Sequence, residues 1–199
     1  MTAVPPLTVA GLRRCFAGRP PGGPVGEGPP AGESLIAAAV LVPIVLREPD
    51  LTVLLTQRTA HLRDHAGQVS FPGGRHEVTD ASLVMTALRE AEEEVGLPAG
   101  QVEVLGCLPE FRTSTGFAVT PVVGLVAPPL NLKLDDFEVA DVFEPPLAFL
   151  LDAANFRREQ VEYRGALREY WAVPWQGRYI WGATAGMLVV LRDYLSGRL

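Results

Sequence analysis

The sequence is poor in cysteine and in long apolar runs, and each shortage excludes a class of protein. Cys15 and Cys107 are the only cysteines among 199 residues. Neither lies at metal-ligand spacing from a second cysteine or a histidine, so a zinc-thiolate site is not expected. They could form one disulfide, but two free thiols in a reducing compartment fit this low content better. The longest apolar run, residues 35–46, is interrupted by Pro43 and falls short of the ~20 residues of a membrane span.

Positive charge is also in short supply. The chain has 17 basic and 23 acidic residues, a formal net charge of −6. This argues against partners such as nucleic acid or an anionic membrane, because both attract a basic surface. A small anionic substrate is still allowed, since a bound metal ion reverses the local charge. The N-terminus lacks the basic-then-apolar order of a secretory signal, so a cytoplasmic location is expected.

Glycine and proline are in excess near the start of the chain. Between residues 18 and 32, 11 of 15 residues are Gly or Pro. Such a segment cannot bury enough apolar area to offset the entropy of ordering it. We therefore expect residues 1–33 to form a flexible or covering arm, with one short helix over residues 7–16. Residues 34–199 are expected to form the folded domain.

Apolar patterns within this domain predict both strands and helices. Segments rich in Val, Ile, Leu and Ala predict strands over residues 34–46, 51–57, 102–107 and 117–126. Helical spacing predicts helices over residues 81–95 and 184–195. Because strands and helices alternate, we expect the α/β or α+β class with a mixed sheet.

The helix over residues 81–95 is the most informative of these elements. Asp80 is its expected N-cap, and Gly96 is its expected end. Its apolar stripe consists of Val84, Leu88, Ala91 and Val95. A stripe of this spacing predicts that one face of the helix packs against a core.

Three glutamates share another face of the same helix. Glu90, Glu93 and Glu94 fall together at about 100° per residue. A solvated acidic face would be the ordinary interpretation, because like charges at this spacing repel one another. The surroundings favour a metal site instead. Arg89 can reach Glu93 one turn away, and the loop that ends at Gly74 offers carbonyl oxygens, so the set suits Mg²⁺ or Mn²⁺.

Residues 89–97, Arg-Glu-Ala-Glu-Glu-Glu-Val-Gly-Leu, resemble the right half of the Nudix box of the Nudix hydrolases. The full box reads Gly-x5-Glu-x7-Arg-Glu-U-x-Glu-Glu-x-Gly-U, where U is aliphatic. The left half departs from it, because Asp80 stands in place of the first glutamate and eight residues, rather than seven, separate it from Arg89. The resemblance implies a Nudix-like mixed sheet sandwiched between helices, and a hydrolase that depends on Mg²⁺ or Mn²⁺.

A second motif lies upstream. Residues 54–59, Leu-Leu-Thr-Gln-Arg-Thr, lead through Arg63, Gly67 and Phe71 to Gly73-Gly74. This stretch resembles the motif of the coenzyme A pyrophosphatase subgroup, with Thr59 where serine or alanine is usual. Shorter stretches at residues 114–117, 142–145 and 180–184 also resemble that subgroup.

The second resemblance implies a small-molecule nucleotide substrate. The expected reaction is hydrolysis of the diphosphate linkage of coenzyme A or acyl-coenzyme A to 3′,5′-ADP and (acyl-)4′-phosphopantetheine. The Nudix box alone also allows ADP-ribose or a dinucleotide as the substrate. A non-catalytic nucleotide-sensing module is a further alternative, but loss of the box glutamates would be its mark, and here they are intact.

The resemblances also imply roles for individual residues. The expected metal-site residues are Glu90, Glu94, Glu93 and Gly74, with Glu90 and Glu94 as direct ligands because a four-residue spacing stacks them. The expected substrate contacts are Arg58, Arg63, Gln68, Ser114, Thr115 and Phe117. The expected catalytic residues are Glu93, Arg89, Glu138 and Glu144, and either of the last two could be the general base.

Some of these residues have structural alternatives. Arg58 and Arg63 would clamp a diphosphate or the 3′-phosphate of coenzyme A, or they would pair with Asp64 or with carbonyls. His61 and His65 fit structural uses better. The three tryptophans are expected in the core or in a homodimer contact rather than in a base-stacking platform; they are Trp171, Trp175 and Trp181.

Overall fold

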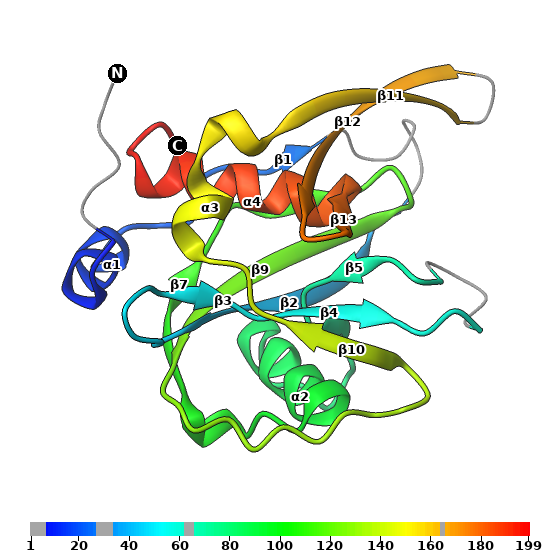
Figure 1. Ribbon diagram of the computed structural model, residues 1–199. Helices are drawn as coiled ribbons and strands as arrows, with labels where there is room; N and C mark the ends of the chain where they lie inside the picture. The colour runs from blue at the N-terminus through cyan, green and yellow to red at the C-terminus, as the bar shows by residue number, and fades with distance from the viewer. Residues whose placement is uncertain (1–6, 27–33, 62–65, 164–165) are drawn as a thin grey trace.

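The computed structural model describes residues 7–26, 34–61, 66–163 and 166–199 (Figure 1). Its helices are α1 (Val9–Phe16), α2 (Leu83–Val95), α3 (Leu147–Leu151) and α4 (Gly182–Leu195), and it has two 3-10 turns, Ala99–Gln101 and Ala153–Asn155. Its strands are β1 (Val25–Gly26), β2 (Ile36–Val45), β3 (Thr52–Val53), β4 (Leu55–Arg58), β5 (Val69–Ser70), β6 (Gly73–Arg75), β7 (Val102–Cys107), β8 (Phe111–Arg112), β9 (Phe117–Val126), β10 (Val139–Phe143), β11 (Arg157–Tyr163), β12 (Ala166–Trp175) and β13 (Arg178–Trp181).

The strands form a mixed central sheet and two smaller sheets. The central sheet has the order β1-β8-β9-β2-β3, with β6 also paired to β2 and β7 also paired to β9. β2 and β9 run parallel from the pair Ile36–Phe117 to the pair Val45–Val126. β6 runs antiparallel to β2, and β7 and β8 run antiparallel to β9. The smaller sheets have the orders β10-β4-β5 and β11-β12-β13.

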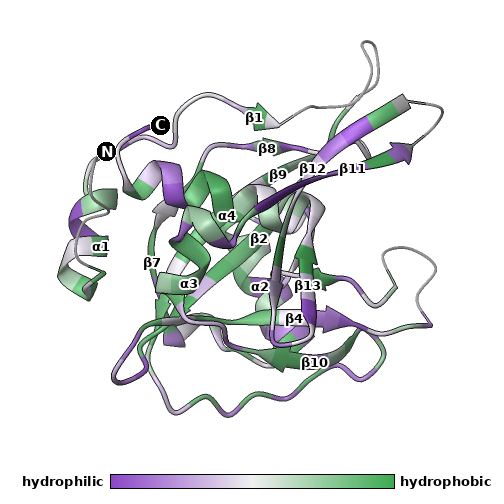
Figure 2. Cartoon of the chain, turned by 45° about the horizontal axis from the view of Figure 1, so that its top comes forward, coloured by the Kyte–Doolittle hydropathy of each residue, from purple (hydrophilic) through white to green (hydrophobic). Residues whose placement is uncertain are grey.

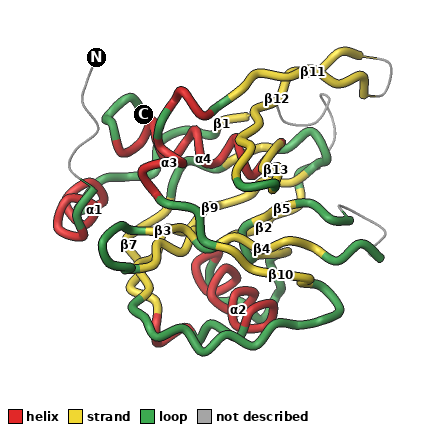
Figure 3. Tube along the Cα trace, viewed as in Figure 1, coloured by secondary structure: helices red, strands yellow, loops and turns green. Residues whose placement is uncertain are grey.

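Alternation of side chains along β2 supports a separate core on each face of the central sheet. Ala39 and Leu41 belong to the cluster that includes the apolar stripe of α2. Val42 and Ile44 belong to the larger cluster, which includes most of α4. The sheet is therefore sandwiched between α2 on one side and α4 with α3 on the other (Figure 1 and Figure 3). This arrangement confirms the predicted mixed α+β class.

The four predicted strands are present, but one of them is divided. The segment predicted as a single strand over residues 51–57 breaks at Leu54 into β3 and β4. β3 pairs with β2 in the central sheet, whereas β4 lies between β10 and β5 in a different sheet. The break moves the residues that follow it, including Arg58, into the sheet that approaches the C-terminal half of α2.

The predicted start of α2 is wrong by two residues, and its predicted end is confirmed. Ser82 is the N-cap, and its side chain accepts a hydrogen bond from the backbone N–H of Met85. Asp80 is not the N-cap because its carboxylate is occupied by other donors, described below. Gly96 ends the helix in the left-handed conformation, with φ of 68°.

The described part of the N-terminal arm covers the body of the protein. Leu12 and Phe16 of α1 are buried in the larger core, and the ring of Phe16 lies 5.0 Å from that of Tyr194 in α4. Further along, β1 adds to β8 as a parallel strand. The arm thus contributes both a helix and an edge strand.

The described helices include none that is long and apolar enough to cross a membrane. Figure 2 shows the apolar residues of β2 and α4 at the centre of the molecule and hydrophilic stretches along β11 and β12, which extend away from it.

Candidate active site between the glutamate helix and strand β6

The carboxylates of Glu90 and Glu94 face β6 rather than open solvent. The backbone N–H of Gly73 donates a hydrogen bond to Glu94 Oε2 at 3.3 Å. The carboxylate of Glu90 lies directly over Gly74, where a Cβ atom would stand 2.4 Å from Glu90 Oε1. A side chain at position 74 would have to displace this carboxylate. The sequence prediction that Gly74 belongs with these glutamates is therefore matched by direct contact.

Glu93 occupies a different position from its two neighbours. Its side chain is 59% exposed and pairs with Arg89 Nη1 at 2.9 Å. By comparison, the Glu90 side chain is 17% exposed and that of Glu94 is 6% exposed. The structure thus separates two inward carboxylates from one outward carboxylate that helps to hold Arg89.

Arg89 is fixed by a dense set of acceptors. Its Nε and Nη2 donate to the two carboxylate oxygens of Asp80, each at 3.0 Å. Its Nη1 donates to Glu90 Oε1 at 3.0 Å, and its Nη2 also donates to the carbonyl of Arg75 at 3.2 Å. These bonds raise the pKa of Arg89 and connect the loop after β6 to the middle of α2.

Asp80 is the residue in the loop after β6 whose carboxylate binds Arg89. Besides Arg89, it accepts hydrogen bonds from the backbone N–H of Glu77 and from Thr86 Oγ1. Donation by Arg89 is the main reason that the pKa of Asp80 lies well below its usual value. The residue that departs from the family pattern therefore positions the box arginine, a role that its sequence spacing did not reveal.

Burial gives Glu94 a pKa far from the usual value of a carboxyl group. Removal from water raises the pKa of Glu94 to about 8, and the opposing effect of the Arg58 guanidinium is smaller. Burial also raises the pKa of Glu90, with Arg89 opposing it. Nearby negative charge from Glu138 adds to both shifts. A cation placed between these groups would relieve an electrostatic cost that the fold itself creates.

Glu138 is held near this cluster by the end of β4. Its carboxylate lies 3.5 Å from Arg58 Nη2. The backbone N–H of Thr59 donates to the carbonyl of Glu138 at 2.9 Å, and Thr59 Oγ1 donates to the carbonyl of Phe137 at 2.8 Å. Two residues of the upstream motif therefore position the loop that carries Glu138.

Glu144, the other candidate general base, lies in a different environment. It accepts two hydrogen bonds from Arg47, at 2.9 and 2.7 Å, and one from Thr52 at 2.7 Å. These contacts lower its pKa. Glu138 precedes the β10 end that pairs with Arg58, and Glu144 follows the end that pairs with Leu55. The structure brings Glu138, and not Glu144, to the box glutamates.

Of the predicted substrate residues after β8, Phe117 lies near β6, and Ser114 and Thr115 lie in the turn before it. Thr115 lies in a turn, where its hydroxyl is 3.0 Å from that of Thr113, and Ser114 lies between these two residues. The guanidinium of Arg75 lies 5.4 Å from the centre of the Phe117 ring. Since the carbonyl of Arg75 binds Arg89, Phe117 lies on the margin of the site.

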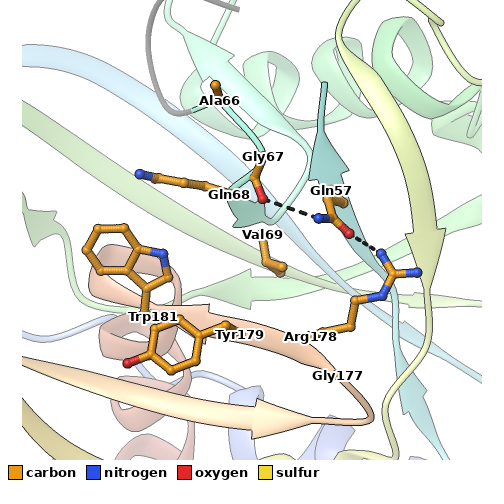
Figure 4. A pocket seen from close by; sticks show the side chains of 9 residues that line it. All are labelled: Gln57, Ala66, Gly67, Gln68, Val69, Gly177, Arg178, Tyr179 and Trp181. Atoms are coloured by element: carbon orange, nitrogen blue, oxygen red, sulfur yellow. Dashed lines mark hydrogen bonds between the residues drawn. The ribbon is translucent and has the colours of Figure 1, made fainter. Parts of the chain in front are cut away.

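A cavity of about 490 Å³ opens between β4–β5 and β13. Gln57, Ala66, Gly67, Gln68, Val69, Gly177, Arg178, Tyr179 and Trp181 line it (Figure 4). Gln57 and Arg58 are adjacent in a strand, so their side chains point to opposite faces of that sheet. The cavity therefore lies across β4 from the glutamate cluster, and Gln68 belongs to the cavity.

Arg178 was not anticipated from the sequence, although it lies on the cavity wall. It donates to Gln57 Oε1 and to Asp141, and it stacks over the ring of Phe143 at 4.7 Å. The register pairs Asp141 with Gln57 across β10 and β4. Arg178 thus joins three sheet strands, and no local sequence pattern indicated these long-range partners.

Two of the remaining predictions lie outside the described residues, namely Arg63 and His65. His61 is described, and its ring lies edge-on to Phe137, with 4.9 Å between ring centres. Trp171 and Trp181 pack against other aromatic rings, and Trp175 stacks on Phe143.

The donor set at the cluster fits a hard divalent cation. Within the described residues, no three His, Cys, Asp or Glu side chains are grouped so as to hold a metal ion by themselves. Mg²⁺ is commonly bound through one or two carboxylates, with water and substrate phosphate completing its shell. Glu90 and Glu94 supply such a pair, and the buried, poorly neutralised Glu94 is the observation that supports the fit.

Known proteins are similar to this chain in sequence. A family profile described as NUDIX domain matches residues 35–164. The protein called "Uncharacterized Nudix hydrolase NudL" from Escherichia coli O1:K1 / APEC is 48% identical over 151 residues, which are 76% of this chain and 78% of that protein.

Two solved structures are similar over part of the chain. The Caenorhabditis elegans Ap4A hydrolase binary complex is 20% identical with a TM-score of 0.49, over 56% of this chain and 80% of that one. The NUDIX domain of Shewanella oneidensis NrtR complexed with ADP ribose is 24% identical with a TM-score of 0.46, over 63% and 81%. The profile match and the 48% identity show that the chain belongs to the Nudix hydrolase family, whose substrates are nucleoside diphosphate derivatives.

Proposed function

We propose that this Nudix hydrolase cleaves the diphosphate linkage of coenzyme A or acyl-coenzyme A. The products would be 3′,5′-ADP and 4′-phosphopantetheine or its acyl form. The arrangement that supports this choice is the upstream motif, whose two ends meet at the cluster. Arg58 and Thr59 approach Glu94 and Glu138, while Gly73-Gly74 lies under Glu90 and Glu94.

The chemistry requires one water molecule to add across the P–O–P bridge. Its oxygen bonds to one phosphorus, the bond from that phosphorus to the bridging oxygen breaks, and the water loses a proton. We assign the general base to Glu138, because it lies beside the inward carboxylates and is 43% exposed, which leaves it accessible to water.

The remaining residues hold this arrangement in place. Mg²⁺ or Mn²⁺ held by Glu90 and Glu94 would neutralise the phosphates and activate the water. Arg89 keeps Glu90 in position through its bonds to Asp80 and Glu93. We propose that Glu93 orients Arg89 and is not a direct ligand, since it faces outward.

The end of coenzyme A remote from the cleaved bond needs a second contact region. The cavity beyond β4 includes two aromatic rings and the amides of Gln57 and Gln68. We propose that Gln68, with Ser114, Thr115 and Phe117 on the opposite margin, contacts the substrate. Arg63 is the proposed contact for the 3′-phosphate, because Arg58 is paired with carboxylates.

We propose the cytoplasm as the site of this reaction. Both cysteines, Cys15 and Cys107, are free thiols, as is usual in a reducing compartment.

A substrate panel tests this function. Coenzyme A, an acyl-coenzyme A, dephospho-coenzyme A, ADP-ribose and a diadenosine polyphosphate would each be incubated with the full chain and Mg²⁺ or Mn²⁺. Phosphate released after addition of a phosphatase, compared with parallel samples lacking the chain, reports cleavage. The highest kcat/KM should belong to coenzyme A or its thioester. Preference for ADP-ribose or the dinucleotide would replace the proposed substrate, and binding without turnover would indicate a nucleotide sensor.

A further inference from the structure

Arg58 lies between two carboxylates without making close hydrogen bonds to either. Its Nη1 is 3.7 Å from Glu94 Oε1, and its Nη2 is 3.5 Å from Glu138 Oε2. Both separations exceed the 2.7–3.2 Å that is usual for N–H···O hydrogen bonds. Its Nε is buried and has no hydrogen-bond partner among the described residues. Within the described residues, the guanidinium is therefore held by electrostatic attraction to the two carboxylates and not by hydrogen bonds.

Arg89, on the other side of the cluster, provides a contrast within the same site. Its nitrogens make hydrogen bonds of 2.9 to 3.2 Å with Asp80, Glu90, Glu93 and the carbonyl of Arg75. Moving Arg89 would break five bonds at once. Within the described residues, moving Arg58 would break no hydrogen bond of comparable geometry, so its displacement should cost less free energy.

The charge that Arg58 neutralises is also the charge that attracts a metal ion. Glu94 is almost fully buried, and only Arg58 and the Gly73 N–H oppose the effect of that burial. Glu138 adds a second negative charge on the other side of the guanidinium. A divalent cation at Glu94 would supply the same compensation with twice the charge, and like charges so close together repel strongly.

We propose that Arg58 is a positioning residue that competes with the divalent cation for Glu94. In the metal-free protein its guanidinium keeps Glu94 and Glu138 together, and cation binding displaces it from Glu94 towards Glu138. This inference rests on the proposed use of Glu90 and Glu94 as metal ligands, but not on which nucleotide is the substrate. It also gives Arg58 a role at the metal site rather than at the 3′-phosphate.

Metal affinity without substrate tests the competition. Mn²⁺ would be titrated into the full chain without oxygen, and the concentration of free Mn²⁺ would be followed by electron paramagnetic resonance. Arg58→Gln should lower the Kd for Mn²⁺ by about tenfold, the size of one charge-assisted contact. Arg58→Lys, which keeps a cation there, should remain close to the unsubstituted protein. Tighter metal binding in Arg58→Gln is an outcome that a merely structural role would not produce.

Arg47→Gln is the matched control, because Arg47 also pairs with a glutamate but lies outside the cluster. Its Kd for Mn²⁺ should not change. An unchanged or raised Kd in Arg58→Gln would overturn the inference and leave the proposed function intact. Absence of Mn²⁺ binding by the unsubstituted chain would overturn both.

A second measurement does not use Arg58→Gln. It therefore still tests the inference if that variant fails to fold. The Nε–H resonance of Arg58, assigned by its absence in Arg58→Lys, should shift when Mg²⁺ is added to ¹⁵N-labelled unsubstituted protein. The Arg89 Nε–H, held by Asp80, should shift less. If addition of Mg²⁺ does not shift the Arg58 resonance, the guanidinium is not displaced.

Discussion

Glu94 is a residue whose protonation depends strongly on the fold. Burial raises its pKa to about 8, from an ordinary value of 4.5. A carboxyl group with a raised folded pKa binds its proton more tightly when folded. Its contribution to stability is therefore complete below the unfolded pKa and is lost as the pH rises through the folded pKa.

This linkage predicts how pH affects stability without metal. Between pH 4.5 and about 8, the unsubstituted chain should lose stability relative to Glu94→Gln, which has no proton to release. Thermal melting of both proteins with a chelator present, over that range, measures the difference. A constant gap in Tm across the range would contradict the assigned burial of Glu94.

The same residues predict a catalytic effect. Glu90→Gln and Glu94→Gln should each lower kcat by several orders of magnitude, because each removes one of the two inward carboxylates. Glu92→Gln is the control on the same helix, since Glu92 is exposed and has no role in the cluster. Its turnover with saturating Mg²⁺ should match the unsubstituted protein. Normal turnover in the first two variants would contradict the metal assignment.

The positions of single residues were predictable where they depended on spacing within one helix. The shared face of Glu90 and Glu94 follows from helical periodicity, and both do face β6. The choice between Glu138 and Glu144 was not predictable. It depends on which end of β10 pairs with Arg58, and that register is set by contacts between strands 80 residues apart, which no local pattern encodes.

Close approach between elements gives the next prediction. β6 and α2 meet where Gly74 lies under the Glu90 carboxylate. Gly74→Ala should displace that carboxylate and lower kcat by about 100-fold, the scale of a 1 Å misplacement in an active site. Gly100→Ala is the matched control, because a Cβ there would meet nothing within 4 Å. Steady-state kinetics and circular dichroism would separate loss of activity from loss of fold.

Elements were predictable where apolar residues are regularly spaced, as in α2, or form a continuous run, as in β2 and β9. α2, β2 and β9 have clear apolar patterns, and their cores fall where expected. The division of residues 51–57 was missed because the apolar pattern continues through Leu54, which is itself fully buried. β11 was missed for the opposite reason, since its charged sequence, Arg-Arg-Glu-Gln-Val-Glu-Tyr, lacks an apolar face.

For the whole molecule, the N-terminal arm should be a determinant of stability. The ring of Phe16 is buried against Tyr194, so Phe16→Ala should destabilise the fold by about 3–5 kcal/mol, as is usual for a buried ring. Leu167→Ala is the control, because that side chain is 68% exposed. Urea unfolding followed by tryptophan fluorescence measures both. Equal stability of the two variants would mean that α1 is dispensable.

The contact between the arm and α4 joins elements that are far apart in the sequence. Arg19 donates to the carbonyls of Tyr194 and Leu199, and Cys15 Sγ lies 4.0 Å from the carbonyl of Leu195. During synthesis the Tyr194 acceptor follows Arg19 by 175 residues. The apolar face of α1 must therefore wait until α4 has been made before the larger core can close around it.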